Sequence, residues 1–458
     1  MKEFSVANLA KIIKAESINN NIGVLTGISI DSRTTKAGDC FFAITGENFD
    51  GHDYVYDAAA RGAVCVVISK NIKIDKLISP TILKVGDTIK ALGDFAREYR
   101  QDNSFKVVAI TGSAGKTTTR QIVYHVLSQR YRVFASPKNF NNNIGLSLTL
   151  LGANPEDQII IAELGSNNPG EISYLTRIAL PDIAVVTNVY PAHIAGFRDM
   201  QTIIKEKLSI SEGLRDKGIL LINSDYDQLV SICRAKKIGF TTFGKSADCD
   251  IQAKNMTHTS FGSQLTIDNT QITLPLYGPG NAENALTAWA ICSRFGMTID
   301  AFARAVQTMP TIPMRAELQQ IGTLTVLNDC YNANPASMQN ALSILTNLNS
   351  VGKRRLVFIC GDMAELGQQS ENLHVELGNY IAKAKVKLLL TIGRFAKITA
   401  EAAKNSAKYD LQTECFENTV SACNNLEKFI KDYDIILVKG SRVAKLEIAI
   451  EKLQKLFS

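Results

Sequence analysis

The fold is decided by the stretch Val107-Val108-Ala109-Ile110-Thr111-Gly112-Ser113-Ala114-Gly115-Lys116-Thr117-Thr118. Its four leading apolar residues predict a buried strand, and the two glycines predict a tight turn that opens a helix. In such a loop the backbone N–H groups surround phosphate oxygens, and the helix N-terminus adds a favourable dipole. Lys116 would hold the β- and γ-phosphates of a nucleotide, and the Thr117 hydroxyl would ligate Mg²⁺. The expected phosphate-binding residues are Thr111, Gly112, Ser113, Ala114, Gly115, Lys116, Thr117 and Thr118.

The spacing of this loop departs from the general G-x-x-x-x-G-K-[ST] form, because Ile110 occupies the position of the first glycine. A glycine turn that only caps a helix therefore stays an alternative. The order of strand, loop, lysine and helix favours phosphate binding.

Short apolar runs alternate with helical patterns along the rest of the chain. Before the loop, two expected strands (40–44 and 63–68) flank an expected helix (55–61), and a second helix (89–96) would bridge to the next unit. After the loop, the expected strands are 107–110, 159–161, 183–187, 219–222, a hairpin of 264–267 with 271–274, then 325–327, 356–359, 388–391 and 435–438. Further helices are expected at 121–129, 282–295 and 444–457. This alternation predicts mostly parallel sheets with helices on both faces.

The length of 458 residues corresponds to about three domains at ~150 residues each. Pro310 and Pro313 punctuate the second boundary. We therefore predict a three-domain α/β protein. Its parts are a small N-terminal α/β domain (1–82), a central P-loop-type domain with a mostly parallel sheet (83–312) and a C-terminal Rossmann-like domain (313–458).

Composition excludes several classes of protein. A chain that is 45% hydrophobic and 21% charged is neither disordered, nor collagen-like, nor a small disulfide-stapled domain. A net charge of +6 over this length suits an anionic small-molecule substrate and is too dilute to indicate nucleic acid. We see no secretory signal and no apolar run near the ~20 residues that cross a membrane. The nine cysteines form no C-x-x-C pair, so we expect reduced, buried thiols and a cytoplasmic location. We also expect a monomer.

Two residues near strand ends are candidate metal ligands. Glu163 follows the strand at 159–161, and His193 lies shortly after the strand that ends at Thr187. Open α/β sheets bind ligands at the carboxyl ends of their strands. A carboxylate suits Mg²⁺, whereas imidazole is an unusual ligand for so hard a cation. Taken alone, Glu163 is also an ordinary strand-end carboxylate and His193 an ordinary loop histidine.

Two runs in the last third of the chain are the most specific signals of a protein family. They are Asp329-Cys330-Tyr331-Asn332-Ala333-Asn334-Pro335 and Gly361-Asp362-Met363-Ala364-Glu365-Leu366-Gly367. Together with the phosphate loop they resemble the Mur ligase family of ATP-dependent amide-forming enzymes, and the resemblance covers essentially the whole chain. The family's loop has the short T-G-x-x-G-K-T-[TS] form, which accounts for Ile110. The resemblance implies that the first domain binds a uridine nucleotide, the second binds ATP and Mg²⁺, and the third binds a dipeptide and closes over ATP.

The resemblance also implies a metal and catalytic site. Thr117, Glu163 and His193 match the family's magnesium-binding hydroxyl, metal-binding glutamate and metal-site histidine. Lys207 falls where the family carries a carbamylated lysine, which would bridge the metal or orient a phosphate. Unmodified, Lys207 would be a solvated helix lysine. The implied catalytic residues are Lys116, His193, Lys207, Arg315 and Asp329, of which Arg315 and Asp329 match positions that reach ATP on domain closure.

Further residues are implied to bind the nucleotide and the substrates. Asn284 lies in a segment that the family places near the nucleotide base, where Gly280 replaces the usual histidine and Asn281 has a second reading as a helix N-cap. The resemblance assigns the uridine nucleotide to Ser32 and Arg33, and the sugar and peptide to Asn139 and Asn142. The Lys439-Gly440-Ser441-Arg442 run would face the incoming dipeptide, and Asn332 and Asn334 are further substrate-binding candidates. Turn asparagines often bond only their own backbone, so that alternative stays open for Asn139 and Asn142.

The implied reaction joins D-alanyl-D-alanine to UDP-N-acetylmuramoyl-tripeptide through an acyl phosphate, with ATP as the phosphoryl donor. This is a step in cytoplasmic peptidoglycan precursor synthesis, and the third residue of the tripeptide is either diaminopimelate or lysine. Rival functions are a family member that adds the third amino acid, a folylpolyglutamate synthetase, or a nucleotide-gated switch. The Tyr331–Pro335 run argues against the first two. A switch would not need a metal-site lysine, a uridine-binding domain and a closing domain in one chain.

Overall fold

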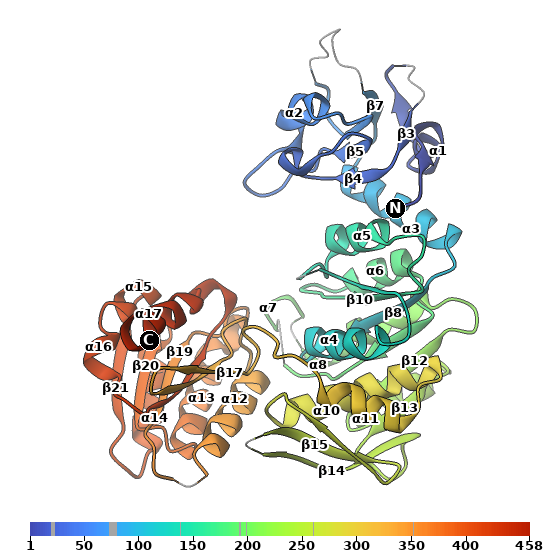
Figure 1. The fold of residues 1–458 in the computed structure, drawn as a ribbon. Helices are drawn as coiled ribbons and strands as arrows, with labels where there is room; N and C mark the ends of the chain where they lie inside the picture. Colours follow the sequence, from blue (N-terminus) through green and yellow to red (C-terminus); the bar gives the residue numbers. More distant parts are fainter. Residues whose placement is uncertain are drawn as a thin grey trace.

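Three α/β units follow one another along the chain in the computed structural model, which describes residues 1–19, 23–72, 80–137, 139–191, 194–197, 199–259, 261–350 and 352–458. The central unit lies between the other two, and the N-terminal and C-terminal units pack against different parts of it (Figure 1). The predicted three-domain α/β fold is confirmed.

The first domain is built on a five-stranded sheet in the order β2-β7-β6-β5-β4, parallel except at the β2 edge. The strands of this domain are β1 (Phe4–Ser5), β2 (Glu16–Ser17), β3 (Val24–Leu25), β4 (Gly27–Ser29), β5 (Asp39–Phe42), β6 (Cys65–Ile68) and β7 (Thr81–Lys84), and its helices are α1 (Val6–Ile12) and α2 (Val55–Ala60). The predicted strands at 40–44 and 63–68 and the helix at 55–61 are confirmed as β5, β6 and α2. β7 crosses the expected boundary at residue 82, and the boundaries at 82 and 312 stay predictions.

Helix α3 (Thr88–Asp102) links the first domain to the second, as the pattern at 89–96 predicts. It begins after Asp87, whose carboxylate accepts the backbone N–H groups of Ile89 and Lys90. Its apolar side is buried against α1 and against two helices of the central domain, α5 (Asn143–Gly152) and α6 (Glu171–Ala179). The link is therefore a shared core as well as a covalent connection.

The central sheet has nine strands in the order β16-β15-β14-β13-β12-β11-β8-β10-β9. Its strands are β8 (Lys106–Thr111), β9 (Val133–Ala135), β10 (Ile159–Glu163), β11 (Ile183–Val186), β12 (Ile219–Asn223), β13 (Thr241–Gly244), β14 (Ile251–Thr259), β15 (Gly262–Ile267) and β16 (Thr270–Leu274). The strands from β14 to β9 are parallel, and β15 and β16 form an antiparallel hairpin. Asp268 and Asn269, both with positive φ, make its two-residue turn, one residue shorter than the predicted loop. The sequence pattern did not predict β9, β13 or β14.

The apolar strand that precedes the phosphate loop lies in the middle of this sheet. Val107 and Ala109 of β8 face one core, with α3, α5 and α6, while Val108 and Ile110 face the other, with α4 (Lys116–Leu127) and α10 (Pro279–Cys292). A strand that is buried on both faces needs apolar residues at every position, which is why four occur in a row. The other helices of the domain are α7 (Ile194–Phe197), α8 (Met200–Leu208), α9 (Asp227–Ala235) and α11 (Ile299–Gln307).

The strand order brings three chain segments to one edge of the sheet. β8 has β10 on one side and β11 on the other, so the chain changes direction across the sheet at this point. Glu163 at the end of β10 is in register with Ile110, and Val186 at the end of β11 is in register with Thr111. Because the three strands are parallel, their carboxyl ends meet where α/β sheets bind ligands.

The third domain has a six-stranded sheet in the order β17-β18-β22-β19-β20-β21, parallel except for β17. Its strands are β17 (Glu317–Ile321), β18 (Leu324–Asn328), β19 (Leu356–Gly361), β20 (Leu388–Ile392), β21 (Gln412–Phe416) and β22 (Ile435–Lys439). Its helices are α12 (Pro335–Leu348), α13 (Ser370–Lys383), α14 (Ala396–Ser406), α15 (Thr419–Cys423), α16 (Leu426–Phe429) and α17 (Glu447–Phe457). All four predicted strands are confirmed, and β17 and β21, which have polar and half-exposed residues, were not predicted.

Two helix boundaries differ from the predicted ones. α4 begins at Lys116 rather than 121, because its first turn carries polar residues that face the phosphate loop and break the apolar periodicity. α17 begins at Glu447 rather than 444, because Lys445 adopts a left-handed backbone conformation with φ +51° that interrupts the helix.

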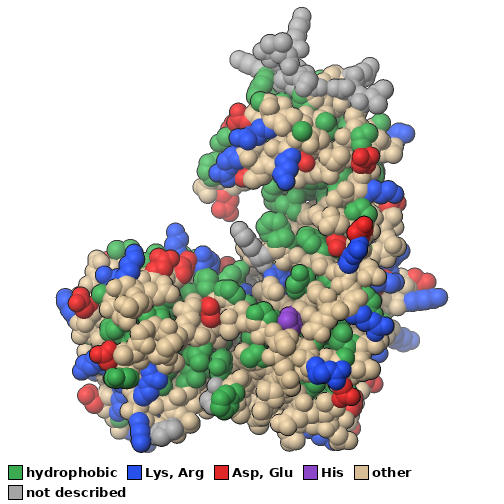
Figure 2. Space-filling model, in the orientation of Figure 1, with side chains coloured by type: hydrophobic (Ala, Val, Ile, Leu, Met, Phe, Trp, Pro, Cys, Tyr) green, Lys and Arg blue, Asp and Glu red, His purple; other side chains and the backbone are tan. Residues whose placement is uncertain are grey.

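The charge distribution on the surface and the state of the cysteines match what the composition predicts, except at two cysteines. Basic and acidic side chains are interspersed on the face seen in Figure 2, which fits a small net charge. Among the described residues, no helix is long and apolar enough to cross a membrane. All nine cysteines are free, but the expectation that all are buried is wrong: Cys249 is half-buried and Cys415 is exposed at the β21 edge.

The junction between α3 and the central sheet gives a stability prediction. Arg100 is fully buried and donates to Oδ2 of Asp182 at 2.7 Å and to the carbonyl of Phe105 at 2.9 Å. We expect Arg100→Ala to lower the free energy of unfolding by about 3 kcal/mol, because it leaves buried acceptors without their cation. Thermal unfolding would measure this, with Arg97→Ala, an exposed change on the same helix, as the control. Equal unfolding midpoints for the two variants would contradict the prediction.

Candidate active site

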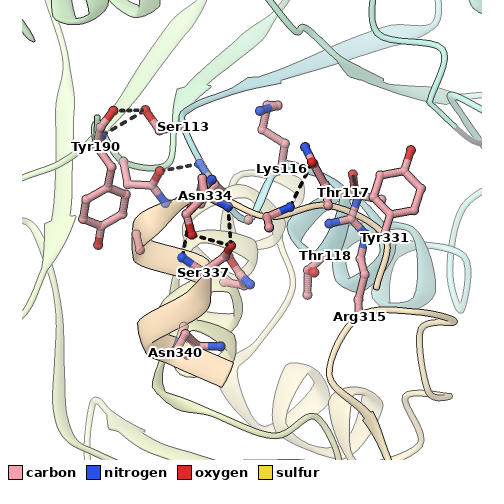
Figure 3. Close-up of a pocket in the computed structure, with 18 of the residues that line it drawn as sticks. Ser113, Lys116, Thr117, Thr118, Tyr190, Arg315, Tyr331, Asn334, Ser337 and Asn340 are labelled. Carbon is pink, nitrogen blue, oxygen red and sulfur yellow. Dashed lines mark hydrogen bonds between the residues drawn. The ribbon is translucent and has the colours of Figure 1, made fainter. Parts of the chain in front are cut away.

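A cavity of about 700 Å³ lies between the central and third domains. The central domain lines it with the phosphate loop and the start of α10, and the third domain lines it with the segment before α12 and with α12 itself. Figure 3 shows Lys116, Thr117 and Thr118 at the start of α4, with Arg315 and Tyr331 beside them. We call this cavity the interdomain pocket.

The phosphate loop is held from two sides. Asn188, just after β11, accepts the backbone N–H of Ala114 at 2.8 Å, and the Ser113 hydroxyl donates to the carbonyl of Tyr190 at 2.9 Å. Gly115 caps α4 with φ +78°, and a Cβ there would overlap Oδ1 of Asn284. Glycine is therefore required at this position by both backbone conformation and space. Contacts with Asn188 and Tyr190 therefore fix the conformation of the loop, and its binding of phosphate stays a prediction.

Glu163 is the acidic centre of the site. It is only 3% exposed, and its Oε2 accepts the Thr117 hydroxyl at 2.8 Å while Oε1 accepts the Asn141 side-chain amide at 3.2 Å. Arg120 lies 3.8 Å from Oε2. A buried carboxylate needs such partners, because desolvation without them is costly. The structure brings Thr117 and Glu163 together, as expected for two oxygen ligands of one cation.

Arg315 reaches the phosphate loop from the third domain. Its Nη2 donates to Oγ1 of Thr117 at 3.1 Å, and its guanidinium lies 4.1 Å from the centre of the Tyr331 ring. Its neighbours Met314 and Ala316 have φ of +60° and +49°, a conformation that is costly for residues with a Cβ. Between these two residues the arginine side chain extends to the central domain, where it bonds Thr117.

Asp329 holds the strained segment in place. Its Oδ1 accepts the backbone N–H of Ala316 at 3.0 Å, and its Oδ2 accepts Lys439 at 2.6 Å. Lys439 is buried and also donates to the carbonyl of Asn332 at 3.0 Å. Lys439 is therefore engaged with Asp329, although the sequence suggested that its run faces the dipeptide. Both Lys439 and Arg442 of this run line the pocket.

The pocket has a positive electrostatic character at the loop. Burial lowers the pKa of Lys116, the positive charge of Arg315 acts in the same direction, and Glu163 opposes it. The Lys116 ammonium donates to the carbonyl of Gly112 at 2.7 Å. Such a group of cations around one buried carboxylate stabilises an anionic ligand that brings further negative charge.

Lys207 lies behind the pocket wall. It is 2% exposed, and its Nζ donates to the hydroxyl of Ser166 at 2.8 Å and lies 5.5 Å from the centre of the Phe197 ring. The alternative that Lys207 is a solvated helix lysine is therefore wrong. Burial, followed by the charge of Lys116, lowers the pKa of Lys207 to about 7, and Glu206 and Glu171 act in the opposite direction.

The structure distributes the other predicted residues over three places. Asn139, Asn142, Asn284, Asn332 and Asn334 line the pocket. The side chain of Asn142 also caps α5, which fits the backbone-bonding alternative for that residue, and the side chain of Asn334 caps α12. Ser32 and Arg33 lie in the first domain, where Arg33 donates to both carboxylate oxygens of Asp31. His193 lies outside the described residues.

Asn281 is not a helix N-cap. The N-cap of α10 is Gly278, and Asn281 lies within the first turn, where its side chain donates to the carbonyl of Tyr277 at 2.7 Å. Asn281 also accepts the side-chain amide of Asn284 at 3.0 Å.

Sequence reasoning missed the contacts of four residues that support the site. Asn141 and Asn188 hold Glu163 and the phosphate loop, while Tyr331 and Lys439 hold Arg315 and Asp329. Asn188 had a usable signal, because it follows a strand beside the loop. Lys439 had none, because only the neighbouring strands β18 and β22 bring it to Asp329.

Fold and site together define a class of protein. The profile described as the Mur ligase middle domain matches residues 110–292, the Mur ligase glutamate ligase domain matches 314–442, and the Mur ligase family catalytic domain matches 24–100. The chain belongs to the Mur ligase family.

Within that family the similarity extends over whole chains. The UDP-N-acetylmuramoyl-tripeptide–D-alanyl-D-alanine ligases of Bacillus subtilis and Escherichia coli are each 32% identical to this chain, covering 98% and 99% of it and the same shares of their own lengths. The structure of MurF from Acinetobacter baumannii matches with a TM-score of 0.89 and 26% identity over 99% of both chains. MurF from Thermotoga maritima in complex with ADP matches with a TM-score of 0.80 and 25% identity, over 94% of this chain and 97% of its own.

The buried lysine gives a pH-dependent prediction. An unfolded chain keeps Lys207 protonated up to its ordinary pKa of 10.5, whereas the folded chain releases that proton near pH 7. Stability of the wild type should therefore rise with pH across this window, and the cost of burying the lysine is greatest below pH 7. We expect Lys207→Met to unfold at a higher temperature than the wild type at pH 7, with the gap narrowing toward pH 10.

Thermal unfolding in CO₂-free buffer over pH 6–10 measures this gap. Lys205→Met, an exposed change on the same helix, is the control and should show no pH-dependent gap. A Lys207→Met gap that stays constant with pH would contradict the lowered pKa.

Proposed function

We propose that this chain is an ATP-dependent, ADP-forming ligase that joins D-alanyl-D-alanine to UDP-N-acetylmuramoyl-tripeptide in peptidoglycan precursor synthesis. Its end-to-end similarity to ligases of that name supports the proposal. The observation that carries it is the meeting of Arg315 with Thr117, because it joins the third domain to a phosphate loop across one pocket. A pocket made by two domains can hold a nucleotide and then enclose the reacting groups.

The chemistry is carboxylate activation by phosphoryl transfer. An oxygen of the terminal carboxylate of the tripeptide attacks the γ-phosphorus of ATP, and ADP leaves. The amine of the dipeptide then attacks the acyl carbon, and phosphate leaves as the amide forms. Carboxylate and γ-phosphate repel one another, so Lys116 and Arg315 supply the positive field that permits their approach. Enclosure between the domains protects the acyl phosphate from water.

We propose Mg²⁺ as the metal of this site. Thr117 and Glu163 offer a hydroxyl and a carboxylate whose oxygens are 2.8 Å apart, and oxygen donors of this kind suit Mg²⁺. His193 is the further candidate ligand from the sequence. When bound, the metal would supply additional positive charge to the transferring phosphoryl group.

Lys207 is proposed to act as a carbamate. A lysine with a pKa of about 7 is largely neutral at slightly alkaline pH, and a neutral amine attacks CO₂ and releases a proton. The product is an acid in place of a cation. The hydrogen bond from Nζ of Lys207 to Ser166, a residue of the pocket wall, supports a carbamate that would lie on the metal and phosphate side.

The three substrates are proposed to bind in three places. The uridine nucleotide binds to the first domain with Ser32 and Arg33, and the sugar and peptide extend past Asn139 and Asn142 toward the phosphate loop. The dipeptide enters from the third domain beside Asn332 and Asn334. The protein is proposed to act as a monomer.

An assay of purified protein tests the reaction. We expect pentapeptide precursor, ADP and phosphate to form in equal amounts from UDP-N-acetylmuramoyl-tripeptide, D-alanyl-D-alanine and ATP. Tripeptides with diaminopimelate or lysine at the third position should be compared side by side. Activity only with a single diamino acid or with glutamate as the acceptor amine would contradict the proposal, and so would ATP hydrolysis without ligation.

The phosphate-loop lysine gives a second prediction. Lys116→Ala should reduce ligation at least about 10³-fold, because it removes a cation aimed at the transferring phosphoryl group. Circular dichroism and thermal unfolding should show a retained fold. Lys236→Ala, an exposed change at the end of α9, is the matched control and should keep full activity. Amide formation that survives Lys116→Ala would show that the nucleotide binds elsewhere.

A further inference from the structure

The first turn of α10 is capped by a residue of another domain. Helices leave their first N–H groups without partners, and the N-cap of α10, Gly278, has no side chain to accept one. The N–H of Gly280 instead donates to Oδ1 of Asn340, 3.0 Å away on α12 of the third domain. Figure 3 shows Asn340 on α12, further along the helix than Asn334 and Ser337.

This contact depends on the absence of side chains at two positions. Gly278 has φ +100°, and a Cβ there would lie 2.6 Å from Cδ1 of Ile344 and 3.1 Å from Oδ1 of Asn340. Gly280 has a helical backbone that any residue adopts, but its Cβ would lie 3.2 Å from Oδ1 of Asn340. Gly280 also stands where the family pattern has a histidine. The Asn340 side chain therefore occupies room that a larger residue at 280 would need.

The capped turn connects the third domain to the phosphate loop. Asn340 and Gly280 both line the interdomain pocket, and so do Asn281 and Asn284 from the first two turns of α10. Asn284 donates to Asn281 at 3.0 Å and fills the space above Gly115. A displacement of Asn340 would therefore shift the start of α10, at the end of the pocket away from Arg315.

We propose that Asn340 is a positioning residue that holds the third domain against the nucleotide site by capping α10 across the domain boundary. The proposal rests on the proposed function. Arg315 fixes the third domain at Thr117, and Asn340 fixes it at Gly280, so the two contacts together set the width of the pocket. ATP affinity depends on both.

A double-mutant cycle tests the pair, with the ATP dissociation constant from calorimetry and the KM for ATP as readouts. Asn340→Ala should weaken ATP binding about five-fold, the value of one net hydrogen bond. Gly280→His should weaken it about ten-fold or more, because the imidazole collides with Asn340. The double variant should bind ATP no more weakly than Asn340→Ala, because removal of the amide makes room for the imidazole.

The kcat at saturating ATP should change less than KM in all three variants, and Thr346→Ala, an exposed change on α12, should alter neither. Asn340→Ala is compatible with its helix, since alanine is the best helix former. If Gly280→His does not fold, as judged by thermal unfolding, Gly280→Ala gives a milder version of the same cycle.

Two results would overturn the proposal. One is unchanged ATP affinity in Asn340→Ala, and the other is a double variant whose loss equals the product of the single losses. Neither result would contradict the proposed function, which is contradicted only if the wild type does not ligate its substrates.

Discussion

The buried carboxylate of Glu163 is the constraint on which the site depends. A charge that is 3% exposed is tolerated only with close hydrogen-bond partners and cations around it. Thr117 and Asn141 supply the hydrogen bonds, and Arg120 supplies a nearby cation from α4. Thr117 and Arg120 come from the start of α4 and Asn141 comes from the asparagine-rich turn, so satisfying one carboxylate fixes that turn against the helix that follows the phosphate loop.

The same cluster extends into the third domain through the Thr117 hydroxyl. Thr117 donates to Glu163 and accepts from Arg315, so one small side chain connects the acidic centre to the third domain. The backbone on either side of Arg315 is strained, and the strain is offset by the Asp329–Lys439 pair below it. The Arg315 side chain is therefore presented by a rigid support rather than by a flexible arm.

The positions of a few charged side chains determine the electrostatics of the site more than the net charge of the chain does. A net charge of +6 on 458 residues says little, and the surface in Figure 2 mixes both signs. Lys116, Arg120 and Arg315 gather around a single carboxylate, where little water screens them. The lowered pKa of Lys207 belongs to the same electrostatic environment, since Lys116 contributes to it.

The sequence by itself determined the α/β class, the phosphate loop and Thr117 and Glu163 as site candidates, because these features lie in contiguous runs with strong periodicity or a motif. Arg315 became a candidate only through the family resemblance. The sequence also predicted most of the buried strands, because an unbroken run of apolar residues indicates a strand that is buried on both faces. It missed half-polar strands such as β14 and β21, which have no unbroken apolar run to mark them. Only the tertiary structure decided that Lys439 pairs with Asp329, that Lys207 is buried and that Asn340 caps α10. Those facts depend on which strands and helices become adjacent, and adjacency is a property of the packed chain rather than of any local run.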